Sequence, residues 1–585
     1  MRILLTAINA KYIHSNLAVY HLKAYARGYE DFIEIAEYTM NQRSEFIFQE
    51  IYKKKPDVLC FSCYIWNYDY VREIAAEFHK LNPDVPIWVG GPEVSYETEK
   101  MFADNPAFFG VIPGEGEAAF AALVQYYCEG RDGELSEIAG IGFRRQTGLR
   151  ETNGIFTTAP GKRSDFYDAP FAYTDMSQFE NRIVYYESSR GCPFSCSYCL
   201  SSIDKKMTFR NLDLVKNEIS FFIENEVLQV KFVDRTFNCN HSHAMEIWQF
   251  IKDADRGITN FHFEIAADLL TQEEILFLST LRPGLIQLEI GVQSTNPKTL
   301  HEIRRKTQLS RIYSAVTQLQ KAQNIHLHLD LIAGLPFEDY DRFKQSFRDI
   351  YALKPDQLQL GFLKVLKGSY MYENRAAYGI IYQDRPPYEV MKTAWITYDE
   401  ILSVKLVEEM LEVYYNSGQF EITMKLVDVV YPDSFSFFLS LGEHYEKNGY
   451  FQKNHSRIRR AEIMLEFLLE DAKMPKDLIE ESLLFDLYYR ENMKSRPFWA
   501  GNPSSFKKVT KSFCKDGKLS HIEPFFYHFP ARGEKSAAKL PDRLSECVYV
   551  LFEYGKRDVL SHQAKTTEYT VLEVKKQWEN EQMKF

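Results

Sequence analysis

Long hydrophobic runs are absent from this 585-residue sequence, in which no uninterrupted apolar stretch approaches the roughly 18 residues of a membrane-spanning helix. The chain opens as Arg-Ile-Leu-Leu-Thr-Ala-Ile, and no basic region or cleavage site of a secretory signal precedes this strand-like run. Basic residues are in deficit, because 70 Lys and Arg stand against 81 Asp and Glu. The formal charge of −11 argues against nucleic acid as a partner. We therefore expect a cytoplasmic protein with no membrane partner.

Cysteines are few and odd in number, nine in all, which argues against a framework of disulfides. Cys192, Cys196 and Cys199 form a C-x3-C-x2-C pattern within residues 190–200. A [4Fe–4S] cluster is normally held by four thiolates, so three would leave one iron open to a small molecule. A structural zinc site would need a fourth ligand, and no CxxC or HxxxH partner follows. The spacing therefore favours an iron–sulfur cluster.

This loop resembles the cluster loop of the radical S-adenosylmethionine (SAM) superfamily, including the aromatic Tyr198 before the third cysteine. In that family SAM chelates the open iron, and one-electron reduction cleaves SAM to a 5′-deoxyadenosyl radical. The resemblance implies an enzyme that carries a [4Fe–4S] cluster on Cys192, Cys196 and Cys199 and uses SAM. It also implies an electron donor such as a flavodoxin or a ferredoxin.

Residues 1 to about 145 alternate strand-like runs (2–8, 58–64, 86–90 and 108–112) with helical patterns such as 70–81. This alternation predicts a parallel, doubly wound sheet, whose ligands would lie outside the carboxyl ends of the strands. Three segments fall at those ends: Ser62-Cys63-Tyr64, Gly90-Gly91-Pro92-Glu93 and Pro113-Gly114-Glu115-Gly116-Glu117. Each segment by itself is more often a tight turn.

Together, and ahead of the cysteine loop, these segments resemble the cobalamin-binding domain of class B radical SAM enzymes. The resemblance assigns cobalamin contacts to six residues: Ser62, Gly90, Gly91, Gly114, Glu115 and Gly116. One feature departs from cobalamin proteins that ligate cobalt from below, which carry Asp-x-His-x-x-Gly after the first strand. Residues 9–16 read Asn-Ala-Lys-Tyr-Ile-His-Ser-Asn. We therefore expect His14 to be a loop residue, with no histidine beneath cobalt.

The strand–helix alternation returns at 183–188, 229–234, 261–266, 285–291, 326–332 and 357–364. Six such units predict a partial (β/α)6 barrel, in which functional groups gather at the carboxyl ends of the strands. Residues 288–294, Leu-Glu-Ile-Gly-Val-Gln-Ser, resemble the fourth-strand SAM motif of the superfamily. The resemblance implies that SAM is bound by Tyr198, Glu264, Glu289, Gln293 and Arg305.

Structural alternatives to these SAM contacts stay open. Glu264 could belong to an ion pair inside the barrel, and Arg305 could belong to a solvated helix face. His326 and His328 alternate on one strand face, and histidines in such places are more often structural than ligands.

Beyond residue 370 the pattern becomes helical, from 387 to about 491, with a helix at 398–415 closed by Gly418. Short strands are expected at 523–529, 547–554 and 567–574, and the basic runs 453–460 and 506–518 read as solvated faces. This part resembles an uncharacterised extension found in some members of the family. We expect three domains, at 1–165, 166–370 and 371–585.

The leading functional hypothesis is a cobalamin-dependent radical SAM methyltransferase that acts on a small-molecule or peptide substrate. Cyclisation or rearrangement by the same machinery remains open. Methylthiolation without cobalamin is a further alternative, although Cys60, Cys63 and Cys128 form no recognisable cluster set. A non-catalytic corrinoid- or SAM-binding regulator is disfavoured by the intact three-cysteine loop. The sequence identifies neither a catalytic residue nor the substrate.

Overall fold

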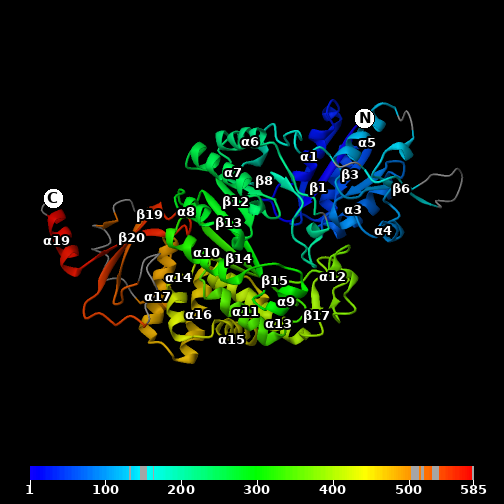
Figure 1. The fold of residues 1–585 in the computed structure, drawn as a ribbon. Coiled ribbons are helices and arrows are strands. Elements are labelled where there is room, and N and C mark those ends of the chain that lie inside the picture. Colours follow the sequence, from blue (N-terminus) through cyan, green and yellow to red (C-terminus); the bar gives the residue numbers. More distant parts are fainter. Residues whose placement is uncertain are drawn as a thin grey trace.

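The computed structural model describes residues 1–130, 134–144, 154–161, 164–203, 205–501, 513–514, 519–529 and 539–582. Figure 1 shows two parallel sheets, each with helices beside it, followed by a helical region and a small antiparallel sheet at the C-terminal end. None of the helices in these ranges is long and apolar enough to cross a membrane.

The first sheet has seven strands in the order β2-β1-β3-β4-β5-β6-β7. Its strands are β1 (Ile3–Asn9), β2 (Ile33–Thr39), β3 (Val58–Ser62), β4 (Ile87–Gly90), β5 (Gly110–Ile112), β6 (Gly142–Arg144) and β7 (Ile155–Thr157). Strands β1 to β5 run parallel, and the β6–β7 hairpin extends the sheet in antiparallel fashion. The predicted doubly wound sheet is confirmed, and residues 145–153, between β6 and β7, lie outside the described ranges.

Helices cover both faces of this sheet: α1 (Leu17–Tyr25), α2 (Ser44–Lys54), α3 (Tyr68–Leu81), α4 (Thr98–Asp104) and α5 (Glu117–Cys128). Apolar residues of α1 and α5, such as Val19 and Phe120, belong to one buried cluster. Those of α2, α3 and α4, such as Ile47 and Phe78, belong to a second cluster. Two separate cores follow from a sheet whose strands are buried on both sides.

The second sheet is wholly parallel and has six strands in the order β15-β14-β13-β12-β11-β8. They are β8 (Ile183–Tyr186), β11 (Gln229–Phe232), β12 (Asn260–Ile265), β13 (Ile286–Gln293), β14 (His326–Ala333) and β15 (Gln357–Phe362). The helices between them are α6 (Leu212–Glu224), α7 (His241–Ala254), α8 (Gln272–Leu278), α9 (Pro297–Glu302), α10 (Leu309–Ala322) and α11 (Tyr340–Tyr351). The predicted partial barrel is confirmed.

Side chains alternate along the barrel strands. In β13, Leu288, Ile290 and Val292 are buried in the core, whereas Glu289 and Gln293 are only partly buried. Because successive side chains of a strand point to opposite faces, the apolar set packs against the surrounding helices and the polar set faces the barrel interior.

The C-terminal region is built from α13 (Tyr398–Leu411), α14 (Glu421–Val430), α15 (Ser434–Lys447), α16 (Arg457–Asp471) and α17 (Lys476–Arg490). Helix α15 packs on the barrel helix α11, where the Phe347 and Phe435 rings meet edge to face at 5.4 Å. A π-helical turn (Glu412–Asn416) prolongs α13, and Gly418 follows with a φ of +61°. The predicted end of this helix is therefore confirmed.

Two C-terminal predictions need correction. The helical region begins at α13 and not at residue 387, because residues 390–392 form β17 (Val390–Lys392), which pairs with β16 (Ile381–Tyr382) after the short α12 (Tyr370–Glu373). The final sheet contains β18 (Ser520–Phe525), β19 (Val548–Arg557) and β20 (Ala564–Tyr569), but α19 (Val571–Gln582) takes the end of the predicted strand 567–574.

The reason for the second correction is a helix-start signal. Thr570 Oγ1 accepts a hydrogen bond from Glu573 N, and Glu573 Oε2 accepts one from Thr570 N. This reciprocal capping box starts a helix and outweighs local strand propensity. Of the predicted basic run 506–518, all but Phe513 and Cys514 lies outside the described residues.

Glu37 on β2 fixes the first sheet to the barrel. Its side chain accepts hydrogen bonds from Arg182 (2.9 Å), Tyr20 (2.7 Å), Asn9 and the backbone N–H of Asn16. Arg182, which immediately precedes β8, also donates to the backbone oxygen of His14. The Glu37 and Arg182 side chains are only 9% and 10% exposed, so each is the main charge partner of the other.

We predict that Glu37→Met lowers the free energy of unfolding by about 3–5 kcal/mol, because it leaves the Arg182 guanidinium buried without its carboxylate. The double variant Glu37→Met/Arg182→Met should be less destabilised than Glu37→Met alone, since it buries no unpaired charge. Urea unfolding followed by circular dichroism measures both. A double variant at least as destabilised as Glu37→Met alone would contradict the pairing.

Candidate active site

The three clustered cysteines lie on one loop at the first barrel strand. Cys192 and Cys196 are buried and Cys199 is partly buried. The loop is fixed from behind, because Ser197 N donates to the Ile303 oxygen and the Ser197 oxygen accepts from Met371 N, both at 2.9 Å. Burial raises the pKa of the Cys196 thiol, the guanidinium of Arg305 lowers it, and the charges of Cys199 and Cys192 raise it further. The charges of Cys192 and Cys199 thus act on Cys196, and the cluster that the three thiolates would hold stays a prediction.

The start of this loop is held by a buried carboxylate. Asp234, two residues after the end of β11, accepts hydrogen bonds from Ser188 N (3.0 Å), Ser188 Oγ (2.7 Å) and Ser189 Oγ (2.6 Å). Burial raises the pKa of Asp234 to about 6, although these three donors oppose the shift. Asp234 thus positions the backbone that leads into Arg190 and Cys192.

A cavity of about 1070 Å³ lies at the carboxyl ends of the barrel strands and extends to the first sheet. Three of the five predicted SAM contacts line it, namely Tyr198, Glu264 and Gln293, together with Cys199 of the cluster loop. Gln293 follows a β-bulge in β13 and has a φ of +73°. This left-handed backbone conformation is unfavourable for a glutamine and is the kind of local strain that functional sites retain.

The other two predicted SAM contacts do not line this cavity. Arg305 is half-buried beside the cluster loop, where it donates to the Gly291 oxygen and lies 3.4 Å from the Tyr198 hydroxyl and 3.8 Å from Cys196 Sγ. Glu289 pairs with Lys231 at 2.9 Å and His262 at 3.0 Å inside the barrel. Their direct contacts with SAM therefore stay predictions.

Glu264 and Glu289 are register partners on β12 and β13, and they titrate in opposite directions. Burial and the nearby Glu289 carboxylate raise the pKa of Glu264 to about 7. Burial also raises the pKa of Glu289, but His262 and Lys231 more than offset it and hold that pKa below its usual range. The ion pair inside the barrel that was considered for Glu264 is thus formed by Glu289. Of these two glutamates, Glu264 is the one that lines the cavity.

A second cavity, of about 740 Å³, lies at the carboxyl end of the first sheet. All six residues predicted to contact cobalamin line it: Ser62, Gly90, Gly91, Gly114, Glu115 and Gly116. Gly91 has a φ of +111°, and a Cβ there would lie 2.5 Å from the Cys63 oxygen. Gly114 has a φ of +73°, and a Cβ there would meet open space. The glycines thus open a concave backbone surface, and the set fits a bulky ligand such as a corrinoid.

The two cavities adjoin, because six residues line both: Ala18, Tyr64, Pro92, Glu117, Arg190 and Leu200. Arg190 lies two residues before Cys192 and donates to Glu187 and, at 2.6 Å, to Glu117 of α5. Glu115 approaches the same guanidinium at 3.8 Å. A single buried arginine therefore connects the cluster loop with the wall of the second cavity.

His14 also bridges the two sheets. Its Nδ1 lies 2.7 Å from the Tyr185 hydroxyl of β8, and both side chains line the first cavity. Burial and the positive charges of Lys11, Lys231 and Arg182 lower the pKa of His14, so the imidazole is neutral at pH 7. Stacked rings of Tyr64 and Trp66, with centroids 4.4 Å apart, line the same cavity.

Several residues that line the first cavity are not among those predicted from the sequence. They include Lys231, Asp330, Tyr185, Arg190 and Trp66. Polar alternation along the barrel strands is the signal that could have identified Lys231 and Asp330. No local pattern places Arg190 or Trp66 in the cavity lining, because Glu117 and much of the rest of that lining come from distant segments. Cys239 is also missed, and its thiol is close enough to Cys192 for their charges to interact.

Comparison with protein families gives three matches along the chain. Residues 3–124 match the B12 binding domain, residues 186–350 match the radical SAM superfamily, and residues 376–539 match a protein family of unknown function, DUF4080. Together they span the first sheet, the barrel and much of the C-terminal region.

Individual relatives agree with these matches. The cobalamin-dependent radical SAM methyltransferase TokK of Streptomyces tokunonensis is 26% identical to this chain over 312 residues. The match covers 50% of this chain and 44% of TokK. The anaerobic magnesium-protoporphyrin IX monomethyl ester cyclase of Synechocystis is 24% identical over 56% of the chain and 67% of the cyclase. The structure of the cobalamin-dependent SAM radical enzyme OxsB superposes with a TM-score of 0.55 at 16% identity, over 83% of this chain and 78% of OxsB.

The chain spans less than half the length of the first curated relatives it matches, and the similarity to OxsB concerns the fold. The matched regions, the three-cysteine loop and the two adjoining cavities agree with one another along the sequence. The chain therefore carries a B12 binding domain, a radical SAM domain and a DUF4080 region, in that order along the sequence.

Proposed function

We propose that this protein is a cobalamin-dependent radical SAM enzyme that transfers a methyl group to a carbon atom of a small-molecule or peptide substrate. The main support for the proposal is that the two cavities lie side by side and share six lining residues. One contains Cys199 and three of the predicted SAM contacts, and the other is lined by all six predicted cobalamin contacts. TokK, a relative named for this activity, supports the same reaction class.

A bound cluster supplies the electron that cleaves SAM to a carbon radical, and a bound cobalamin supplies the methyl group. The protein's part is binding and orientation. The thiolates of Cys192, Cys196 and Cys199 would hold the cluster, and Glu264 and Gln293 would hold SAM against it. The walls of the shared cavity would keep water from the reactive groups while the substrate is in place.

The glycine-rich edge of the first sheet would hold cobalamin. Backbone at Gly90, Gly91 and Gly114 lets the ligand approach closely, and Glu115 and Gly116 lead into α5. His14 is already oriented by Tyr185, which supports a role in the first cavity over one beneath cobalt. We propose the division 1–165, 166–370 and 371–585 for the domains that carry out these tasks.

Cyclisation is the second candidate, and one observation favours it: the Synechocystis relative is named a cyclase and matches over a larger share of its own length than TokK does. The products separate the two reactions, because only methyl transfer adds a carbon to the substrate. A regulator that binds corrinoid or SAM without chemistry would cleave no SAM. The reductant, a flavodoxin or a ferredoxin, and a cytoplasmic location are parts of the same proposal.

We predict that anaerobic reconstitution loads the wild-type protein with a [4Fe–4S] cluster and that the Cys192→Ala, Cys196→Ala and Cys199→Ala variants each fail to hold a catalytic one. Iron and sulfide analysis measures loading, and 5′-deoxyadenosine formation from SAM with dithionite measures activity. Cys128→Ala, on α5, is the matched control and should load normally. SAM cleavage by the triple Cys→Ala variant would refute the assignment.

We predict that Gly91→Val abolishes cobalamin binding while iron loading is retained. A valine at φ +111° would be strained, and its Cβ would lie 2.5 Å from the Cys63 oxygen, so the loop at the cavity must move. Gly28→Ala is the control, because Gly28 has a φ of +86° with nothing near a Cβ and does not line the cavity. Absorbance titration with hydroxocobalamin measures binding, and equal affinity in both variants would place cobalamin elsewhere.

We predict that Glu264→Gln weakens SAM binding about ten- to a hundred-fold, because loss of a charge-assisted contact typically costs roughly 1.5–3 kcal/mol. The pKa of Glu264 is about 7, so SAM affinity of the wild type should fall as the pH drops below 7 and the carboxylate gains a proton. Glu289→Gln, which alters a carboxylate outside the cavity lining, should have the smaller effect. Equilibrium dialysis on cluster-loaded protein from pH 6 to 8.5 measures both, and the reverse order would restore Glu289 as the SAM contact.

A further inference from the structure

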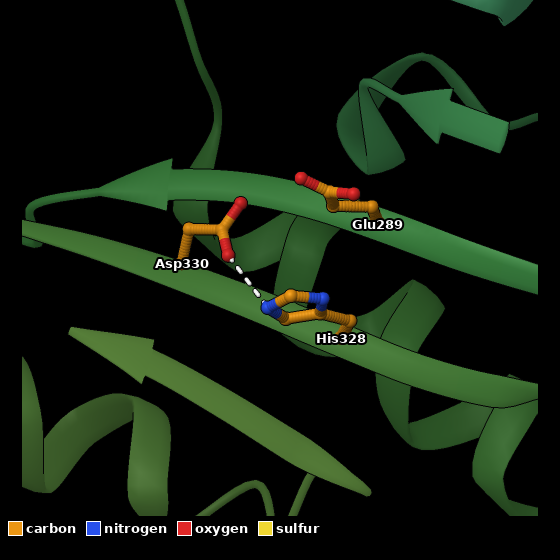
Figure 2. A group of neighbouring side chains, drawn as sticks. All are labelled: Glu289, His328 and Asp330. Atoms are coloured by element: carbon orange, nitrogen blue, oxygen red, sulfur yellow. Dashed lines mark ion pairs between the residues drawn. The ribbon is translucent and has the colours of Figure 1, made fainter. Parts of the chain in front are cut away.

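The interior of the barrel holds a group of metal-binding side chains beneath the first cavity. Glu289 on β13 and His328 and Asp330 on β14 each offer one ligand atom, and these atoms lie within 4.8 Å of one another (Figure 2). His262 on β12 joins them, because its Nε2 lies 3.0 Å from Glu289 Oε2. Three side chains from two adjacent strands thus converge on one small volume, and His262 on the neighbouring strand β12 borders it through Glu289.

The polar atoms in this group are unusually poorly satisfied. His328 Nε2 lies 3.0 Å from Asp330 Oδ1, as the dashed line in Figure 2 marks. Nevertheless, His262 Nε2, His328 Nε2 and Asp330 Oδ1 are all buried atoms that lack a hydrogen-bond partner of acceptable geometry. Both imidazoles are only 8% exposed. Such buried groups each cost about 1–3 kcal/mol when unpaired, so three of them together call for an explanation.

We propose that His262, Glu289, His328 and Asp330 bind one divalent first-row transition metal ion. Two imidazole nitrogens and two carboxylates are a ligand set that suits Zn²⁺ and its neighbours. The nitrogen–oxygen separations of 3.0 Å are slightly shorter than the roughly 3.3–3.6 Å between tetrahedral ligands with bonds of about 2.0–2.2 Å. Because the contacts are close but poorly aligned for hydrogen bonding, coordination satisfies these atoms better than the pairs do.

The position of the site connects it with the cavity. Asp330 lines the first cavity, whereas Glu289, His262 and His328 do not. An ion held by all four would therefore lie in the floor of the cavity, on the side away from the cobalamin edge. It would be separate from the cluster loop, whose ligands come from residues 192–199.

Lys231 is the group that opposes a metal ion. Its Nζ lies 2.9 Å from Glu289 Oε2, so in the metal-free protein it neutralises one of the two carboxylates. A divalent ion bound to Glu289 would be repelled by this ammonium. Removal of the lysine charge should therefore tighten metal binding, whereas a plain ion-pair network would only lose stability.

The test uses full-length protein that carries Cys192→Ala, Cys196→Ala and Cys199→Ala, because the cluster thiolates would themselves bind zinc. We expect this protein to bind one equivalent of Zn²⁺ in competition with a chromophoric chelator. Adding His262→Gln or His328→Gln should weaken this binding by about a hundredfold, and His326→Ala, two residues before His328 on β14, should not change it. Adding Lys231→Met should strengthen it at least several-fold.

The outcomes are decisive in either direction. Less than half an equivalent of zinc, or a stoichiometry and affinity unaffected by both His→Gln substitutions, would overturn the proposal. Weaker zinc binding in the Lys231→Met protein, with its circular dichroism spectrum unchanged, would also overturn it. Glutamine is close to histidine in size, and the circular dichroism spectrum of each variant separates unfolding from ligand loss. Iron loading and SAM cleavage by the native-cysteine protein test the proposed function independently, so failure of one does not imply failure of the other.

Discussion

The buried ion-pair network around Arg190 is the interaction on which the arrangement of the active site depends. Arg190 lies two residues before the first cluster cysteine, and its guanidinium reaches Glu187 and Glu117. Glu117 begins α5, directly after the glycine-rich segment of the second cavity. A guanidinium meets several carboxylates at once because its donors are fixed in a planar fork. The three-cysteine loop and the glycine-rich edge of the first sheet are therefore joined by one side chain, and neither could shift without breaking this charge pair.

Two further polar contacts keep the sheets in this relation. Glu37 joins Arg182 just before the first barrel strand, and Glu93 joins Lys367 at 3.0 Å in the lining of the first cavity. Both carboxylates come from the first sheet region, and both cations belong to the barrel or the segment that follows it. The cavity between the sheets is thus bordered by ion pairs whose partners are far apart in sequence. A large polar cofactor and a substrate can enter such a space without disturbing the apolar cores behind it.

The barrel strands show how one sequence pattern serves stability and function together. Their buried residues, such as Leu288 and Ile290, pack against the surrounding helices, while the alternate residues form a charged interior. This interior contains Glu264 near the cavity and the group of His262, Glu289, His328 and Asp330 below it. The environment separates the two glutamates, because Glu289 has two cationic or donor partners and Glu264 has none of comparable strength. The partners that neighbouring strands supply, and not the local sequence, distinguish the two carboxylates.

The sequence by itself determined the order of the two parallel units, the cysteine loop and the glycine-rich turns, because alternation, spacing and turn chemistry are local properties of the chain. The sequence pattern did not reveal β2, because the charged Glu34 and Glu37 weaken the apolar pattern of this edge strand. It also predicted a strand at 567–574 whose second half belongs to α19, the helix that a capping box begins. It placed Glu289 and Arg305 among the SAM contacts, and because neither side chain lines the first cavity, both contacts stay predictions. Only the tertiary structure decided which polar residues meet, because Arg190, Glu117, His14 and Tyr185 become neighbours through packing of the two sheets. Such contacts depend on distances between segments more than a hundred residues apart in some cases, and no short-range pattern encodes them.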